Sequence, residues 1–253
     1  MKLGEAAQIT IGTPSTKRSF EFYRQLGFVK VSEGKNPNPW VQVTDGTLLI
    51  FLNQDRLSYI SLTYFSRNSR TKLMELDRIG VNFLQRSEKK AKSPTGTFLS
   101  PNKLVITIIE HDTANMYRPK GKTLKDISKV DIRNPEKYPN IKCGVFGEFT
   151  HPVKDLAVSV EFWKKVGFEL LSINQKPYPW AIVSDDNIIL GLHQTKHFKQ
   201  PAITYFAPDM AERINRLQQE GMKGIMGFGK QNGSIKNAVV KTPEGQQVFL
   251  FSM

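Results

Sequence analysis

Near the N-terminus, short segments of the chain place their hydrophobic residues with either a strand period or a helix period. A β-type alternation at 8–12 comes first. It precedes a segment with helical spacing, in which Ser15 is suited to cap the start and Gly27 to end the helix. Strand-like runs follow at 28–32, 40–44 and 48–52. This order predicts one βαβββ module.

The same order of elements recurs within the first half of the chain and twice more in the second half. After a strand-like run at 58–65, a segment with helical spacing ends at Gly80. Strand-like runs then lie at 82–85, 96–99 and 104–109. In the second half, Asp155 is a predicted helix cap, and Asp209 with Glu212 resembles a capping box. The whole chain therefore predicts four βαβββ modules.

The two halves of the sequence also match each other in a colinear way. The matching stretches are Gly27-Phe28 with Gly167-Phe168, Pro37-Asn38-Pro39-Trp40 with Pro177-Tyr178-Pro179-Trp180, and Thr63-Tyr64-Phe65 with Thr204-Tyr205-Phe206. Colinear matches of this kind indicate a tandem duplication. We therefore predict one domain at 1–115, a basic, proline-containing connector at 116–141, and a second domain at 142–253.

The segment around the first helix of each half resembles a known superfamily. The two segments are Ser19-Phe20-Glu21-Phe22-Tyr23-Arg24-Gln25-Leu26-Gly27-Phe28 and Ser159-Val160-Glu161-Phe162-Trp163-Lys164-Lys165-Val166-Gly167-Phe168. With the four modules, they resemble the vicinal oxygen chelate superfamily, which includes glyoxalase I, extradiol dioxygenases and bleomycin-resistance proteins. The resemblance implies an α+β fold of two tandem domains. In each domain, two βαβββ modules would form a curled mixed β-sheet cup with the helices outside.

Metal-using members of this superfamily hold an ion in the cup with His, Gln or Glu from the first and last strands of each module. The resemblance carries these places onto two sets of residues: Gln8, Phe51, about Ile60 and Thr107, then Glu148, Gly191, about Pro201 and Phe249. Each set has at most one residue able to bind a metal, whereas such an ion needs three or four ligands. We therefore predict no metal and no other cofactor, and a divalent metal is the disfavoured alternative.

Alternation along the predicted strands indicates which side chains line the cups. The predicted ligand-binding residues are Gln8, Trp40, Gln42 and Tyr64 in the first half and Glu148, Trp180, His193 and Tyr205 in the second. Aromatic rings with a few polar groups are typical of small-molecule sites. The alternative is that these rings belong to the core or to a contact between domains.

Few side chains offer catalytic chemistry. Of the 4 histidines, only His193 is predicted to lie in a cup, where Glu148 would accompany it. A Glu–His pair within hydrogen-bond reach is a candidate for general acid and base catalysis. His151 is predicted to lie on the opposite face of its strand. Cys143 has no evident activating partner and is expected to behave as a small hydrophobic residue.

Composition narrows the class of protein. The 253 residues carry a formal net charge of +13, and the single cysteine excludes an intramolecular disulfide. No hydrophobic run is long enough to span a membrane and no signal peptide is evident, so we expect a cytoplasmic protein without a membrane partner. Positive charge is typical of nucleic-acid binding. However, the lysines are scattered and the run at 88–92 resembles a solvated hairpin tip, so a nucleic-acid partner is disfavoured.

Three functions are compatible with these features. The favoured one is metal-free binding of a small molecule in a cup, by a glyoxalase-like or bleomycin-resistance-like protein. The first alternative is a metal-dependent lyase or dioxygenase with an unusual ligand set drawn from Gln8, Glu148 and His193. The second is an assembly module, in which side chains fill the cups and the chain forms a homodimer. The positive charge argues against a cationic drug such as bleomycin as the ligand.

Overall fold

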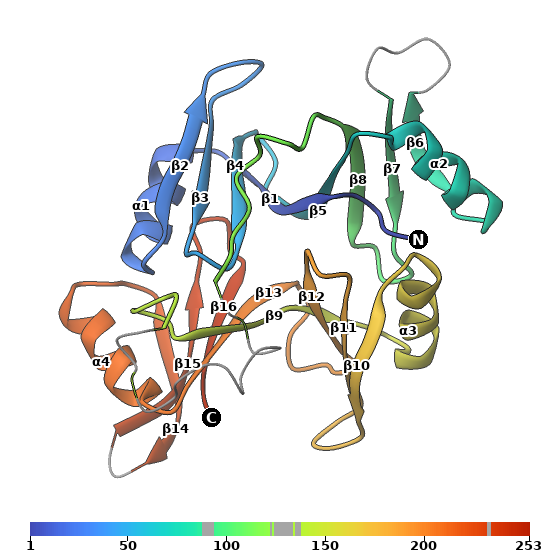
Figure 1. The fold of residues 1–253 in the computed structure, drawn as a ribbon. Helices are drawn as coiled ribbons and strands as arrows, with labels where there is room; N and C mark the ends of the chain where they lie inside the picture. Colours follow the sequence, from blue (N-terminus) through green and yellow to red (C-terminus); the bar gives the residue numbers. More distant parts are fainter. Residues whose placement is uncertain (88–93, 122, 124–133, 135–137, 232–233) are drawn as a thin grey trace. The chain divides into compact units, whose positions relative to one another are not determined.

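The computed structural model describes residues 1–87, 94–121, 123, 134, 138–231 and 234–253 (Figure 1). The basic run predicted to form a hairpin tip, and most of the predicted connector, lie outside these residues. The elements of the first half are β1 (Ala6–Thr13), α1 (Thr16–Gln25), β2 (Val29–Gly34), β3 (Trp40–Thr44), β4 (Leu49–Gln54), β5 (Tyr59–Ser66), α2 (Ser69–Arg78), β6 (Phe83–Ser87), β7 (Thr95–Leu99) and β8 (Val105–Glu110).

The second half repeats this order of strands and helices. Its elements are β9 (Val145–Pro152), α3 (Leu156–Lys165), β10 (Glu169–Asn174), β11 (Trp180–Ser184), β12 (Ile189–His193), β13 (Ala202–Ala207), α4 (Met210–Gln219), β14 (Ile225–Gln231), β15 (Ser234–Lys241) and β16 (Gln247–Ser252). The predicted series of four βαβββ modules and the α+β fold are therefore confirmed. None of the described helices is long and apolar enough to cross a membrane.

Each half contributes one mixed, eight-stranded sheet. The strand orders are β2-β3-β4-β1-β5-β8-β7-β6 and β10-β11-β12-β9-β13-β16-β15-β14. Consecutive strands of a module pair antiparallel, as β3 does with β4, whereas the first and last strands of a module run parallel, as β5 does with β8 and β13 with β16. The division of the chain into the three predicted segments stays a prediction.

One face of each sheet is covered by helices, and we call the other the open face. In β3, Val41 and Val43 are buried on the helix side, while Trp40 and Gln42 are half-buried on the open face. Helix α1 packs on β3 and β4, as Figure 1 shows. The aliphatic residues of alternate strand positions thus form the core between sheet and helices.

Local capping sets the limits of the helices. The Ser15 side chain accepts the Arg18 backbone N–H at the start of α1, and Asp155 accepts the Val158 N–H at the start of α3, as predicted. Asp209 does precede α4, but its side chain makes no cap hydrogen bond. Its Oδ1 instead accepts the Arg213 Nε at 2.8 Å, so the predicted capping box is wrong. The Asp209 carboxylate therefore binds the buried Arg213 guanidinium in place of the backbone N–H groups at the start of α4.

The chain packs as two compact units, and each contains parts of both halves. One unit is made of 1–10, 60–118 and 150–199, and the other of 11–59, 119–149 and 200–253.

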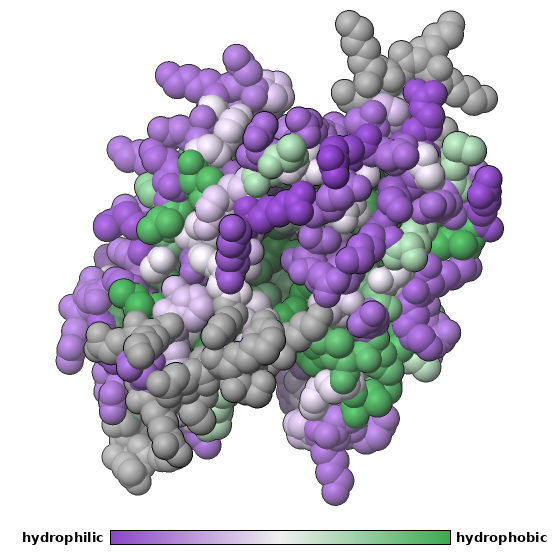
Figure 2. Space-filling view, viewed as in Figure 1, coloured by the Kyte–Doolittle hydropathy of each residue, from purple (hydrophilic) through white to green (hydrophobic). Residues whose placement is uncertain are grey.

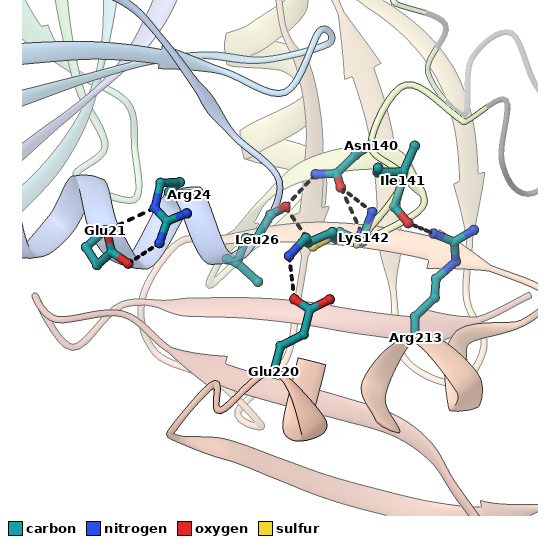
Figure 3. Close-up of polar contacts among 9 residues, drawn as sticks. Glu21, Arg24, Leu26, Asn140, Ile141, Lys142, Arg213 and Glu220 are labelled. Carbon is teal, nitrogen blue, oxygen red and sulfur yellow. Dashed lines mark hydrogen bonds and ion pairs between the residues drawn. The ribbon is translucent and has the colours of Figure 1, made fainter. Parts of the chain in front are cut away.

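In the second of these units, the segment before β9 is held by side-chain contacts (Figure 3). Asn140 Nδ2 donates to the Leu26 carbonyl at 3.0 Å, and its Oδ1 accepts the Cys143 N–H at 2.8 Å. Arg213 donates to the Ile141 carbonyl at 2.6 Å.

Candidate functional site in the second half

Trp180 and His193 lie side by side on the open face of the second sheet. They are register partners on β11 and β12, and their rings are nearly parallel, with centroids 6.5 Å apart and 21° between the planes. Both side chains are half-buried, whereas Ala181 and Leu192, one position along each strand, are fully buried. The structure therefore brings two of the sequence-predicted residues together on a face that is still accessible.

Two further rings from loops complete a group around His193. The Tyr178 ring, from the loop before β11, lies 5.7 Å from the His193 ring, and Phe198, from the loop after β12, lies at 5.8 Å. His197 contacts Tyr178 at 5.9 Å. We call these five residues, Tyr178, Trp180, His193, His197 and Phe198, the aromatic cluster. Four of its members are half-buried and His197 is exposed, so the rings are available to a ligand.

Backbone contacts fix the loops that carry the cluster. Trp180 Nε1 donates to the Lys176 carbonyl at 2.9 Å, which holds the indole in place. The Gln194 N–H donates to the Pro179 carbonyl at 2.9 Å, and the Gln194 side chain accepts the Leu156 N–H, at the first residue of α3, also at 2.9 Å. The loops are thereby tied to each other and to a helix, which orients the rings in advance of binding.

The corresponding face of the first half has different side chains. Trp40 stacks on Phe51, with centroids 5.2 Å apart, and Asn53 takes the place of His193 and donates to the Tyr59 hydroxyl at 3.1 Å. Gln42 accepts the Ser32 hydroxyl at 3.1 Å. The predicted Trp40 and Gln42 are thus on the open face, but no imidazole accompanies them there.

Tyr64 and Tyr205 are not on an open face. Thr63 is the register partner of Thr107 and its hydroxyl lies 2.8 Å from that of Thr10, so the next residue, Tyr64, points to the helix side. Both tyrosine rings are fully buried. The alternation expected for β5 and β13 is therefore off by one residue, because runs that mix hydroxyl and aromatic side chains do not distinguish their two faces.

Each of these tyrosines has its hydroxyl directed to an aspartate of the other sequence half, within a single compact unit. The Tyr205 hydroxyl donates to the Asp45 carboxylate. Burial and the charge of Asp185 raise the pKa of Tyr64 well above its ordinary value. The two rings therefore serve packing between the halves, and we no longer assign them to ligand binding.

The remaining candidates lie on the first strands of the two halves. Gln8 on β1 is 4% exposed and Glu148 on β9 is 6% exposed. Glu148 and His193 belong to different compact units, and their pairing stays a prediction. His151 is 3% exposed, and neither ring nitrogen has a hydrogen-bond partner among the residues that the structure describes. Burial also raises the pKa of the Cys143 thiol, which agrees with an unreactive residue.

At the positions where the resemblance places metal ligands, the side chains do not fit a metal ion. In the second half, Phe249 stacks on Phe251 at 5.5 Å, and Phe206 and Phe228 each lie 5.9 Å from Phe251. Ring carbons provide no ligand to a divalent ion. Within the described parts of the chain, no three His, Cys, Asp or Glu side chains gather in a way that could hold a metal.

Strand β10 forms one edge of the second sheet and exposes hydrophobic side chains. Leu170, Leu171 and Ile173 are 39%, 38% and 54% exposed. Figure 2 shows hydrophobic residues gathered over this part of the molecule. An exposed edge strand of this kind can pair with another chain. The predicted homodimer nevertheless stays a prediction.

Sequence reasoning missed three members of the aromatic cluster. Tyr178 stands in the repeated Pro-x-Pro-Trp stretch, where the first half has Asn38, and that difference was an available signal. His197 and Phe198 follow β12 in a loop with no period. Their contacts with Tyr178 and His193 depend on the folded path of the chain.

No family model matches this sequence, and no curated protein matches it either. Several solved structures share its fold along the whole chain. A catechol 2,3-dioxygenase is 11% identical with a TM-score of 0.60, covering 100% of this chain and 89% of that one. The 2,3-dioxygenase LapB from Pseudomonas sp. KL28 is 10% identical with a TM-score of 0.61, covering 100% and 93%.

A variant of homoprotocatechuate 2,3-dioxygenase from Brevibacterium fuscum, in complex with HPCA, is also similar. It is 10% identical with a TM-score of 0.62, covering 100% of this chain and 72% of that one. Identities this low carry information about fold and not about activity. The chain therefore has the same tandem βαβββ fold as these dioxygenase structures.

Proposed function

We propose that the protein binds a small molecule with a planar aromatic ring at the aromatic cluster, without a resident metal. The observation that carries the proposal is the group of half-buried rings around His193, oriented by bonded loops on an open sheet face. Aromatic pairs gain energy beyond the burial of their area, so a planar ligand would be favoured over a saturated one. His193 adds one polar group that can hydrogen-bond a ligand hydroxyl.

The dioxygenases of similar fold suggest a probe but not a reaction. One of them is a catechol 2,3-dioxygenase, and catechol is a flat ring with two neighbouring hydroxyls. Such a molecule matches both the rings and the imidazole of the cluster. Ring cleavage is not part of the proposal, because phenylalanine rings stand at positions where a metal would need ligands.

The test is calorimetric titration of the full chain with catechol and with cyclohexane-1,2-diol, which has the same hydroxyls on a saturated ring. We expect catechol to bind and the diol to bind at least about fivefold more weakly, from the loss of ring contacts. His193→Asn introduces the residue found at the matching place of the first half, and Trp180→Leu removes the indole. Each should weaken catechol binding several-fold. His111→Asn, an exposed histidine outside the cluster, is the matched control.

Two results would count against the proposal. Equal affinity for the two probes would show that the rings do not select a planar ligand. An equal loss in His111→Asn and His193→Asn would place binding elsewhere. The dioxygenase alternative has its own readout, since catechol cleavage after addition of ferrous iron would show that a metal site forms despite the phenylalanines.

A further inference from the structure

A groove of about 460 Å³ lies beside α1, within the compact unit that does not contain the aromatic cluster. One wall is a single face of the helix. The other wall is the turn after α4 together with the end of β15. Its lining includes Arg18, Phe22, Gly224, Lys241 and Pro243. A volume of this size suits a small organic ligand.

The walls of the groove are tied together by bonds beneath it. The Ser19 hydroxyl on α1 donates to the Glu244 carboxylate, next to Pro243. The Lys241 N–H donates to the Gly224 carbonyl at 3.3 Å, which joins the end of β15 to the turn after α4. The groove is therefore part of the packed structure.

The groove carries unbalanced positive charge. Arg18, Lys223 and Lys241 are exposed, and their side chains have no ion pair or hydrogen bond within the described part of the chain. The one acid in the lining, Glu21, is already paired with Arg24 at 3.0 Å (Figure 3). Three free cations around one groove attract an anion, and an arginine fork suits phosphate oxygens.

The sequence duplication supplies an internal comparison for these charges. The matching place in the fold lies beside α3. There the helix carries Val158 where α1 carries Arg18. On the opposite wall, Asn82 and Leu99 stand where the groove has Lys223 and Lys241. The acid and the phenylalanine of the helix face recur there as Glu161 and Phe162, and Pro101 recurs in place of Pro243. The fold therefore does not require the three cations, which are particular to one of two equivalent places.

We propose that this groove binds a phosphate-bearing small molecule of about nucleotide size. Arg18, Lys223 and Lys241 would hold the phosphates, and the half-buried Phe22 ring would contact the organic part. The site differs from the aromatic cluster in its residues and in the compact unit that contains it. It does not depend on the function proposed above.

The experiment is calorimetric titration of the full chain with ADP, with inorganic pyrophosphate and with adenosine. ADP and pyrophosphate should bind, more weakly as salt rises, and adenosine should not bind measurably. Lys223→Asn, Lys241→Leu and Arg18→Val introduce the residues of the matching place at α3. Each should weaken ADP binding up to about fivefold, in line with exposed ion pairs, and the triple variant should abolish it. All three positions are exposed, so the variants are expected to fold.

Lys17→Asn is the control, because Lys17 is an exposed lysine of the same helix that does not line the groove. It should leave ADP binding unchanged. The proposal fails if wild-type protein binds neither phosphate compound, if adenosine binds as well as ADP, or if Lys17→Asn loses as much affinity as Lys223→Asn. It also fails if a short DNA duplex displaces ADP and all four single variants weaken the duplex equally, which would indicate general charge attraction.

Discussion

Replacing His151 with isoleucine removes a titratable group from the buried interior at β9. The histidine is 3% exposed, and both ring nitrogens lack hydrogen-bond partners in the described structure. Burial lowers its pKa from 6.5 to about 4. The matching residue of the first half is Ile11, which is fully buried, so isoleucine is compatible with this place in the fold.

The sign of the effect follows from proton binding by the two states. Below pH 6.5 the unfolded chain takes up a proton at His151, whereas the folded chain stays neutral there until about pH 4. The contribution to stability is therefore fully present above pH 6.5 and is lost as the pH falls toward 4. Linkage predicts that the free energy of unfolding falls by about 2 kcal/mol between pH 7 and pH 5. The whole decrease, reached below pH 4, is about 3 kcal/mol.

Urea unfolding of wild-type protein and His151→Ile at several pH values between 7 and 5 measures this difference. The gap between the two free energies of unfolding should widen by about 2 kcal/mol in favour of the variant as the pH falls. His111→Gln, at an exposed histidine, should follow the wild-type curve. Parallel curves for wild type and His151→Ile would refute the reasoning, because they would show that His151 is protonated equally in both states.

Other substitutions test the packing between the sequence halves and the helix ends. Tyr205→Phe removes the hydroxyl that donates to Asp45 and should lower the free energy of unfolding by about 1–3 kcal/mol in urea denaturation. Gly27→Ala sets a Cβ on a residue with φ of 90° and 2.9 Å from Asn140 Oδ1, so it should cost more than the backbone strain of about 1–2 kcal/mol. Gly80→Ala, with φ of 75° and nothing within 4 Å of the added Cβ, measures that strain alone, and equal losses would contradict the argument.

The fold was predictable because its signals are local. Ser15 and Asp155 cap helices from their own sequence neighbours, and Gly27 and Gly80 end helices with the positive φ that glycine allows. In β3, Val41 and Val43 alternate with Trp40 and Gln42, and in β12, Leu190 and Leu192 alternate with Gly191 and His193. Their open faces, with Trp40 and His193, could therefore be read from the sequence.

The parts that could not be predicted depend on partners far away in the chain. Tyr64 and Tyr205 looked like ligand contacts, because an amphipathic ring fits either face of a strand. What decides their direction is an aspartate in the other half, more than a hundred residues away. The place of Phe198 in the aromatic cluster could not be predicted for a similar reason, because only the folded loop brings its ring to His193.

The turns that carry Asp45 and Asp185 show how two copies of one motif differ in energy. In each turn, one carboxylate oxygen accepts two backbone N–H groups, from Thr47 and Leu48 at 2.9 and 2.8 Å, and from Asn187 and Ile188 at 3.1 and 2.9 Å. The second oxygens differ. Asp45 Oδ2 accepts from Tyr205 and from Asn140, whereas Asp185 Oδ2 is buried near the Tyr64 hydroxyl but forms no hydrogen bond of ordinary geometry in the described structure.

This difference predicts opposite outcomes for the same substitution. Burial raises the pKa of Asp185 above its ordinary value of 3.8, so its ionised form opposes folding at every pH above that raised pKa. Asp185→Asn removes the charge and keeps an oxygen for the two N–H groups, so it should leave stability at pH 7 unchanged or increase it. Asp45→Asn would turn an amide N–H₂ toward the Asn140 N–H₂ and the Tyr205 hydroxyl, and should cost about 1–3 kcal/mol.

Urea unfolding at pH 7 of the two single variants decides between these outcomes. A loss in Asp185→Asn as large as that in Asp45→Asn would show that the Asp185 charge is stabilised by a partner as effective as Tyr205. A second measurement separates charge from hydrogen bonding. The advantage of Asp185→Asn over wild type should shrink as the pH is lowered toward 3.8, because the wild-type carboxyl then gains its proton and, like the variant, carries no buried charge.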